Sequence, residues 1–482
     1  MVFSERLSAP STGSPNLSGT RPFRVIIVGA GVGGLVMSHA LTRAKIDHVV
    51  LEKGVVAPQW GASISIWANG ARILQQLGCW EAIRAACQPL QMLYVRDASG
   101  ISYSAEPYFD MMTEMNGFEY VTLERRKFLK ILQEQHPDPQ KIWEGKKVIE
   151  VLDTGTNILA KLDDGTVEEG DMLIGCDGVH STVRELMWRN ANVAVPNLIT
   201  TREKTSLETT YRALVGVAKP ILGMGTNDMH WITHWGMSFL ILTQPNETFF
   251  FVNWKLPQKS TWPSKAKWNE AEAEIAAASV AHLPITDSVV TPNLALGAMC
   301  AMESSVVLVN KIKNMVDNLG SEQRPSKDSI RDMLLEFQAE RMNRQQEASR
   351  ASAFLTRLHA YDGFLKWLIM RWIIPTVGQA RIAHIMGDFC SRAPRISFLP
   401  VDYVRKAAYK WQDEPDHVPA QPENSIMRQK GRLLASEILQ PASIFAMGLI
   451  LYVMSATFFK HYVIPTVVIA LPKDELLGET SR

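Results

Sequence analysis

The stretch FRVIIVGAGVGGLVMSHALTRAKIDHVVLEK, residues 23–53, decides the fold of this chain. Residues 24–28 are rich in β-branched side chains and predict a strand, and residues 48–51 predict a second one. Residues 35–44, between them, have the composition of a helix. A strand, a glycine turn, a helix and a strand in this order are typical of the unit that binds dinucleotides.

The glycine turn carries a G-x-G-x-x-G pattern at Gly29, Gly31 and Gly34. Gly29 allows a tight turn out of the strand, Gly31 lets a pyrophosphate approach the backbone, and Gly34 lets the helix pack closely. The amino end of the helix offers free N–H groups and a positive dipole end to phosphates. The pattern predicts a dinucleotide site, and the alternative is a glycine turn in an unrelated α/β protein.

Glu52 follows the second strand, 18 residues after Gly34. A carboxylate at this position can accept hydrogen bonds from both hydroxyls of an adenosine ribose. The same charge repels a 2′-phosphate. The dinucleotide expected here is therefore FAD or NAD, not NADP.

The bulk composition excludes several classes of protein. The chain has 482 residues, of which 46% are hydrophobic and 21% charged, as in a globular protein of two or three domains. A net charge of +1 gives no field that favours nucleic acid. The five cysteines contain no CxxC pair, and no His/Asp/Glu cluster has ligand spacing, so we expect neither a disulfide framework nor a metal site.

Two further motifs carry charged residues at turns. Arg125 opens a predicted helix, where a cation opposes the helix dipole, so a phosphate or ribityl oxygen would explain its place. A solvated basic face explains it equally well. Asp177 lies in a second tight turn, GCDGVHSTVR at residues 175–184, which runs into another helix.

These motifs together resemble the group A flavin monooxygenases, which are related to the aromatic hydroxylases. The pieces GAS, NGARILQQLG and TPNLALGA are similar, more narrowly, to fungal enzymes that epoxidise prenyl chains in meroterpenoid and indole-diterpene pathways. The resemblance implies that Glu52 and Arg125 hold FAD and that the Asp177 turn serves both FAD and NADPH. It also implies positions beside the flavin for Ser65, Gly297 and Ala298.

The resemblance implies an α/β fold in which a Rossmann-like FAD-binding domain carries an inserted β-sheet substrate domain. NADPH is expected to reduce FAD, and one oxygen atom of O2 goes to an alkene of a hydrophobic, prenylated substrate. Two rival interpretations stay open. One is a flavin-dependent dehydrogenase or oxidase on the same scaffold, and the other is an inactive, membrane-anchored remnant.

The predicted organisation follows the changes of composition along the chain. A disordered amino terminus is followed by the first part of the FAD-binding domain, the substrate sheet, the return of the FAD-binding domain, a helical and linker region, a transmembrane helix and a tail. Their predicted bounds are residues 1–22, 23–204, 205–290, 291–360, 361–440, 441–460 and 461–482.

Residues 205–260 predict four strands crowded with aromatic side chains, most of which a hydrophobic core explains. In the resembled family this sheet lies over the flavin and lines the substrate pocket. Tyr211 and Arg212 are then candidates for orienting the substrate or donating a proton.

The chain departs from the family between Val290 and Thr291. Family members carry a few dozen residues there, including a core strand and a Gly-Asp turn whose aspartate holds the ribityl chain. Losing a strand from a sheet is expected to leave two neighbours with unpaired backbone groups, at about 1–3 kcal/mol for each buried group. We therefore expect the chain to be impaired.

Two apolar segments near the carboxyl end point to a membrane. Residues 441–459 contain no charge over 19 positions, which is long enough to cross a bilayer, although a buried helix is the alternative. Arg428, Lys430 and Arg432 precede this segment, so the catalytic part is expected to face the cytoplasm. Residues 361–378 are also very apolar but carry two cations, which is typical of an interfacial or buried segment.

Overall fold

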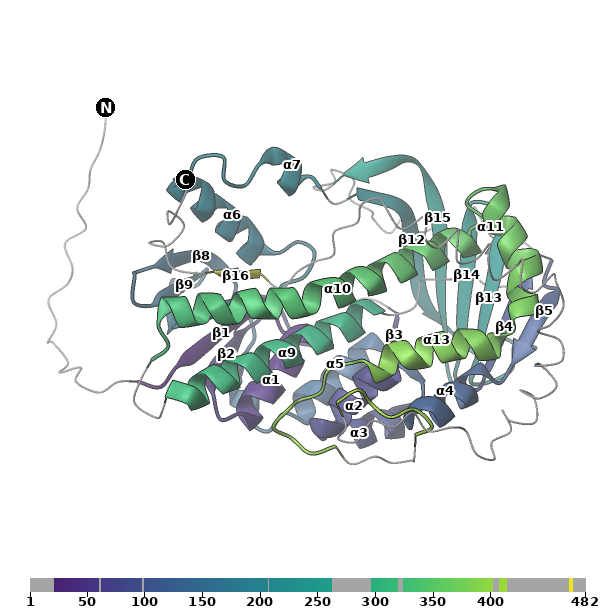
Figure 1. Ribbon diagram of the computed structural model, residues 1–482, viewed down its shortest axis with the longest axis horizontal. Coiled ribbons are helices and arrows are strands. Elements are labelled where there is room, and N and C mark those ends of the chain that lie inside the picture. Colours follow the sequence, from purple (N-terminus) through teal and green to yellow (C-terminus); the bar gives the residue numbers. More distant parts are fainter. Residues whose placement is uncertain are drawn as a thin grey trace, which may run out of the picture.

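The computed structural model describes residues 21–59, 62–97, 99–206, 208–261, 296–319, 324–401, 407–413 and 468–470. In Figure 1 the α/β part of the molecule lies at one end and a large, mostly antiparallel sheet lies at the other. The long helix α10 (Lys327–His359) runs between the two ends. Ser326 accepts a hydrogen bond from the Ser329 amide at 3.1 Å and caps this helix, as its sequence predicts.

The α/β part is built on a five-stranded sheet with the order β16-β11-β1-β2-β7. Strands β11, β1, β2 and β7 are parallel, and β16 is antiparallel to β11. The bounds are β1 (Arg24–Val28), β2 (Asp47–Leu51), β7 (Ile142–Trp143), β11 (Met172–Gly175) and β16 (Val468–Ala470). The predicted strand, glycine turn, helix and strand of residues 23–53 are thus confirmed.

Both faces of this sheet are covered, as a parallel sheet requires. Val25 and Ile27 belong to the core formed with α1 (Val32–Arg43) and α9 (Leu296–Leu319). Ile26 and Val28 face a second core formed with the small sheet β8 (Val148–Asp153), β9 (Ile158–Leu162), β10 (Val167–Gly170) and with α6 (Thr182–Ala194). Successive side chains of β1 point to opposite faces of the sheet, so this strand contributes to both cores.

Strand β16 provides a partner for the outer edge of β11. Strand β11 pairs with β1 on one edge and with Val468–Ala470 on the other, so both of its edges are hydrogen-bonded. A segment near the carboxyl end supplies a partner that the sequence comparison with the family did not suggest. The join between Val290 and Thr291 lies outside the described residues.

The second large sheet has six strands, in the order β12-β15-β14-β13-β4-β5. The four strands predicted in residues 205–260 are β12 (Glu208–Ala218), β13 (Asp228–His234), β14 (Met237–Thr243) and β15 (Thr248–Thr261). They are joined by β4 (Met92–Asp97), parallel to β13, and by β5 (Ser102–Glu106). The sheet therefore extends beyond the predicted 205–290 segment.

The remaining elements surround these two sheets (Figure 1). They are β3 (Ser63–Ile66), α2 (Ala68–Gln76), α3 (Trp80–Ala86), α4 (Tyr108–Asn116), β6 (Val121–Glu124), α5 (Arg125–Glu134), η1 (Pro139–Lys141), α7 (Thr201–Lys204), α11 (Phe364–Leu368), η2 (Ile369–Ile373), α12 (Ile374–Val377) and α13 (Gln379–Ser391).

Within the ranges that the structure describes, no helix is long and apolar enough to span a bilayer. The predicted transmembrane segment, residues 441–460, lies outside those ranges. Of the predicted disordered segment, residues 1–22, all but the last two residues also lie outside them.

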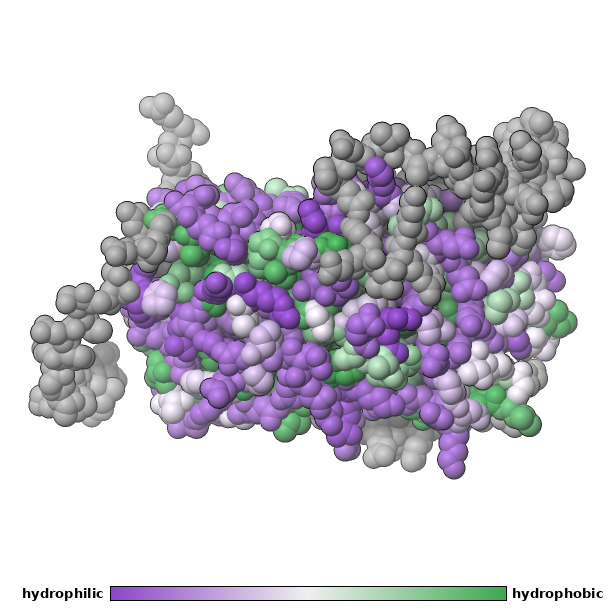
Figure 2. Space-filling model, turned by 90° about the horizontal axis from the view of Figure 1, so that it is seen from below, coloured by the Kyte–Doolittle hydropathy of each residue, from purple (hydrophilic) through white to green (hydrophobic). Residues whose placement is uncertain are grey.

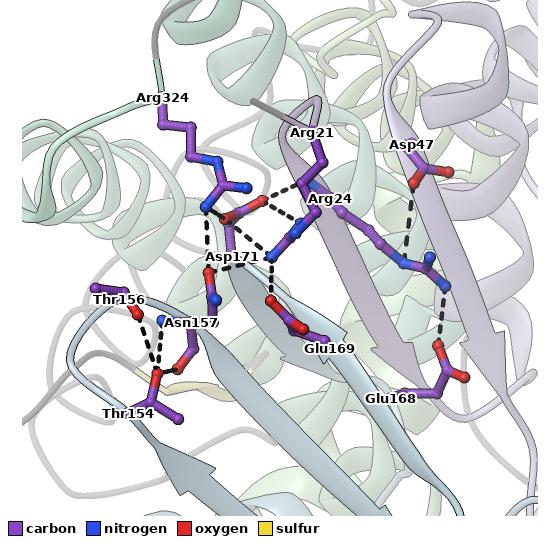
Figure 3. A network of polar contacts seen from close by, with 10 residues as sticks. All are labelled: Arg21, Arg24, Asp47, Thr154, Thr156, Asn157, Glu168, Glu169, Asp171 and Arg324. Carbon is purple, nitrogen blue, oxygen red and sulfur yellow. Dashed lines mark hydrogen bonds and ion pairs between the residues drawn. The ribbon is translucent and has the colours of Figure 1, made fainter. Parts of the chain in front are cut away.

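Asp171 ties the amino-terminal edge of the parallel sheet to two other elements (Figure 3). Its carboxylate accepts hydrogen bonds from the Arg24 amide at 2.7 Å and from the Arg21 guanidinium at 3.0 Å, and it lies 3.5 Å from Arg324. Arg24 in turn pairs with Glu168 of β10 at 2.9 Å. Gly170-Asp171 therefore stabilises the edge of the sheet that is opposite to the glycine turn.

Three buried histidines gather at α1: His39 belongs to the helix, and His48 and His136 approach its Ser38. The Oγ of Ser38 lies 2.9 Å from the Nε2 atoms of both His48 and His136. The Nε2 of His39 lies 2.7 Å from the Leu132 carbonyl oxygen, to which it donates. Burial lowers the pKa of His39 to about 3 and that of His136 to about 4, so both rings are neutral at pH 7.

This cluster predicts that the protein loses stability in acid. A histidine has a pKa of about 6.5 in the unfolded chain, so the unfolded state binds more protons than the folded state below that pH. Stability should fall as the pH drops from about 6.5 to about 4, by at most about 1.4 kcal/mol per pH unit for each histidine. Urea denaturation across this range measures the slope, and His39→Gln should make it shallower. A slope unchanged by this substitution contradicts the assignment.

Candidate cofactor site

The glycine turn between β1 and α1 is closed on one side and open on the other. Gly29 has φ +103°, and a Cβ there would lie 2.6 Å from the carbonyl oxygen of Cys176. A Cβ at Gly34 would lie 1.9 Å from the Gly29 carbonyl oxygen. At Gly31 the nearest such atom is 4.0 Å away. Glycine is therefore required at two positions by packing, and the third leaves space above the turn.

The amino end of α1 presents unpaired donors to that space. Gly31 is the N-cap of this 12-residue helix, so no side chain caps it, and its first turn has no acidic residue. The first N–H groups of a helix have no partner within the helix. An anion at this point would accept hydrogen bonds from them and would lie at the positive end of the dipole.

Glu52 lies beside the turn and also supports it. One oxygen of its carboxylate accepts a hydrogen bond from the Ala30 amide at 2.7 Å, and the other accepts one from the Gly54 amide at 3.0 Å. A carboxylate has about four acceptor positions, so two remain for the hydroxyls of a ribose. The contact with Ala30 is a role that sequence reasoning missed.

Arg125 is a half-buried cation at the start of α5. Its backbone amide donates to the Ala62 carbonyl at 3.0 Å, which places it beside β3. Burial lowers the pKa of Arg125. Among the residues that the structure describes, its guanidinium forms no ion pair, so it is suited to meet the charge of a phosphate or a polar oxygen of a ligand.

The second tight turn lies directly against the first. A Cβ at Gly29 would be 2.9 Å from the Cα of Asp177. One oxygen of Asp177 accepts from the Val183 amide at 3.1 Å, and the other is buried with no hydrogen-bond partner in the described part of the chain. Because β1 and β11 are parallel neighbours, their carboxyl ends bring both turns to one edge of the sheet.

Ser65, Gly297 and Ala298, which the resemblance places beside the flavin, lie in two different elements. Ser65 lies in β3, is 5% exposed, and donates its hydroxyl hydrogen to Thr122 at 3.1 Å. Gly297 and Ala298 lie in the first turn of α9, where Gly297 is exposed. Helix α9 crosses α1 at Ser305, whose hydroxyl donates to the Gly33 carbonyl at 2.9 Å. Gly297 is thus about 12 Å along the helix from that crossing, at 1.5 Å per residue.

Tyr211 and Arg212 point to opposite faces of β12, since successive side chains of a strand alternate. The Arg212 guanidinium lies 5.2 Å from the ring centre of Trp254 on the neighbouring strand. The hydroxyl oxygen of Tyr211 is buried on the other face. The structure therefore does not bring the two candidates together, and their catalytic roles stay predictions.

Asn253 shares the face of Tyr211 and was missed by sequence reasoning. It lies opposite Ala213 in the register between β12 and β15, two residues from Tyr211 along the strand. The side chain is 4% exposed, and its Nδ2 has no partner within the described ranges. In the sequence, Asn253 is indicated only by its being the one amide side chain in the otherwise apolar run FFFVNW.

These residues fit an FAD. The open glycine turn accepts a pyrophosphate, Glu52 retains acceptors for a ribose, and Arg125 supplies a cation that has no ionic partner in the described part of the chain. In the part of the chain that the structure describes, no group of three or more His, Cys, Asp or Glu is arranged to hold a metal ion.

Comparisons with known proteins agree with this fit. Residues 23–294 match the family model described as an FAD binding domain. The chain is 34% identical over 437 residues to the FAD-dependent monooxygenase DEP2 of Alternaria brassicicola, covering 82% of each chain. It is 32% identical over 432 residues to the FAD-dependent monooxygenase penE of Penicillium thymicola, covering 80% of this chain and 90% of the relative.

Solved structures of other flavoproteins share the fold. The Klebsiella pneumoniae HpxO complexed with FAD and uric acid superposes with a TM-score of 0.60 at 19% identity, covering 79% of this chain and all of that one. A salicylate hydroxylase substrate complex gives a TM-score of 0.53 at 16% identity, covering 75% of this chain and 98% of the other. With the family model and the two fungal relatives, the chain belongs to the FAD-dependent monooxygenases.

Proposed function

We propose that this protein uses NADPH and O2 to epoxidise or hydroxylate a hydrophobic, prenylated intermediate of secondary metabolism. The open glycine turn, with Glu52 beside it, is the observation that carries the proposal. The similarity of GAS, NGARILQQLG and TPNLALGA to fungal prenyl epoxidases supports the substrate class. The apolar wall of the six-stranded sheet suits such a substrate.

The chemistry that bound FAD supplies is the passage of electrons from NADPH to O2. The protein's own residues bind and orient. The α1 amino end and the glycine turn hold the pyrophosphate, and Glu52 holds the ribose. The Asp177 turn lies close enough to the glycine turn to position both FAD and NADPH. Aromatic side chains of the six-stranded sheet exclude water from the substrate.

A flavin-dependent dehydrogenase or oxidase on the same scaffold is the second candidate, and the fungal relatives do not favour it. Oxygen-18 separates the two. Turnover of a prenylated indole or meroterpenoid precursor under 18O2 should give a product that carries one labelled oxygen atom. An unlabelled, dehydrogenated product contradicts the monooxygenase assignment.

Glu52→Ala is expected to weaken FAD binding. The substitution removes the ribose acceptor and the support of the Ala30 amide, and a hydrogen bond to a charged group contributes about 1.5–3 kcal/mol. The FAD dissociation constant should rise by about 10- to 100-fold, as measured by flavin fluorescence titration. Glu150→Ala, an exposed carboxylate of β8, is the control and should leave the constant unchanged. Equal constants for both variants would remove Glu52 from the site.

We also propose that the segment absent between Val290 and Thr291 impairs flavin binding, and that residues 441–460 attach the protein to the cytoplasmic face of a membrane, on the side where β16 pairs with β11. Full-length protein from membranes should hold less than one FAD per chain. Restoring a family Gly-Asp segment at the join should raise that ratio. A full complement of FAD and normal turnover in the native chain would contradict the impairment.

A further inference from the structure

An exposed aromatic face lies at the end of the molecule farthest from the glycine turn (Figure 1). It consists of the exposed Trp235, in the turn between β13 and β14, of the exposed Phe364, Leu365 and Trp372 on α11 and η2, and of the half-buried Trp367 between Trp235 and Phe364. Their exposed fractions include 68% for Phe364 and 61% for Trp372. We call this set the aromatic face. Seen from below, most of the surface is hydrophilic, with apolar residues scattered over it (Figure 2).

The aromatic face is one continuous patch. Trp367 stacks on Trp235 with ring centres 6.4 Å apart, and Phe364 lies 5.3 Å from Trp367. Leu365 and Trp372 are 44% and 61% exposed on the same helical segment, which passes from α-helix to π-helix between them. Large side chains exposed singly are ordinary on a soluble protein, whereas a contiguous apolar patch marks a binding surface.

Other side chains of the helical segment formed by α11 and η2 pack into the hydrophobic core. Ile369, Met370 and Ile373 are buried against the rest of the protein. The segment therefore has apolar side chains on two sides. Packing within the fold explains the inner side and leaves the outer side without a partner among the described residues.

Cations border the aromatic face. Lys255 and Arg357 both pair with Asp362, each at 2.6 Å. Lys366 donates to the Asp362 carbonyl oxygen at 2.8 Å, and the Arg371 guanidinium lies 5.8 Å from the ring centre of Trp372. Within the ranges described, neither Lys366 nor Arg371 forms an ion pair. The border therefore carries excess positive charge.

Tryptophan with lysine and arginine around an apolar patch is the composition that proteins use at a membrane surface. Aromatic rings with a polar edge are enriched at the level of the lipid headgroups. Lysine and arginine extend their charged ends toward anionic headgroups while their stems cover apolar surface. A segment that is apolar yet charged lies in the interface and does not cross the bilayer.

We propose that the aromatic face docks on the surface of a bilayer that contains anionic lipids. This inference deepens the membrane association proposed above, because it assigns a second contact that is separate from residues 441–460. Residues 414–440 join residue 413 to that segment, and at about 3.3–3.6 Å per residue they reach at most about 97 Å. A tether of this length keeps the aromatic face near the bilayer and so raises the effective concentration of lipid that the face meets. A face with low intrinsic affinity for lipid is therefore sufficient for docking.

The test uses the full-length chain reconstituted into vesicles of phosphatidylcholine and phosphatidylserine. An environment-sensitive dye is attached at Leu365→Cys in one preparation and at Val193→Cys, an exposed position of α6, in the control. All five native cysteines are buried or half-buried, so the new thiol is labelled preferentially. The readout is quenching of the dye by lipids brominated on their acyl chains.

Quenching should be severalfold stronger at position 365 than at position 193. It should weaken in the K366E/R371E double variant and in vesicles of phosphatidylcholine alone. Vesicle-bound protein with equal, weak quenching at both positions overturns the docking face and leaves the anchor standing. A dye at position 365 that is shielded from water but not quenched shows that protein covers the face, which also overturns the proposal. None of these readouts depends on flavin content or turnover.

Discussion

Gly34→Ala is expected to abolish FAD binding and to lower the melting temperature strongly. The new Cβ would lie 1.9 Å from the Gly29 carbonyl oxygen, and that atom is part of the backbone. Gly29 cannot retreat, because its own Cα already faces the Cys176 carbonyl and its φ of +103° is open only to glycine. The start of α1 must therefore move away from β1, and the pyrophosphate space is lost.

Gly33→Ala is the matched control, one residue earlier in the same turn of helix. A Cβ there would lie 3.6 Å from the Ser305 hydroxyl oxygen and 3.7 Å from the Ala301 Cβ, which are ordinary contacts. Alanine is also favoured over glycine inside a helix by about 1 kcal/mol. Flavin absorbance of the purified protein and thermal denaturation measure both variants. If Gly34→Ala keeps its flavin as Gly33→Ala does, the close packing of α1 on β1 is not what forms the site.

The parts of the fold that the sequence predicted are those fixed by local pattern. The unit of residues 23–53 combines strand, turn and helix signals within one short stretch. The place of β4 in the second sheet was not predicted, because its partner β13 comes more than a hundred residues later. No periodicity of residues 92–97 reveals which strand they pair with. The pairing of β16 with β11 is still more distant in sequence.

The candidate site divides in the same way. Gly29, Gly34, Glu52 and Asp177 were predicted and do converge, because carboxyl ends of parallel strands share one edge of a sheet. Tyr211 and Arg212 are adjacent in the sequence, and adjacency in a strand places their side chains on opposite faces of the sheet. The sequence alone did not fix which residues of β12 to β15 share a face, since that depends on register.

Glu303 is a further residue that sequence reasoning missed, since its partners come from distant parts of the chain. Its side chain is 1% exposed, and it accepts hydrogen bonds from Asn69 of α2 at 2.8 Å and from Arg344 at 2.7 Å. Arg341, 4% exposed, donates to the same carboxylate at 2.9 Å. Burial alone would raise the pKa of Glu303, but the hydrogen bonds and charges of Arg344 and Arg341 outweigh it and hold this pKa below its usual value.

Glu303→Gln is therefore expected to destabilise the protein by about 3–5 kcal/mol, because it leaves two guanidinium groups buried without a counter-charge. Urea denaturation with saturating FAD measures the change. Asp317→Asn, on the same helix, is the control. Its pair with Lys313 is 57% exposed on the aspartate side and should contribute at most about 1 kcal/mol. Removing Arg344 together with Glu303 should cost less than the sum of the single changes, since the two act as one unit. Equal small losses for Glu303→Gln and Asp317→Asn would mean that the charge of Glu303 does not hold α2, α9 and α10 together.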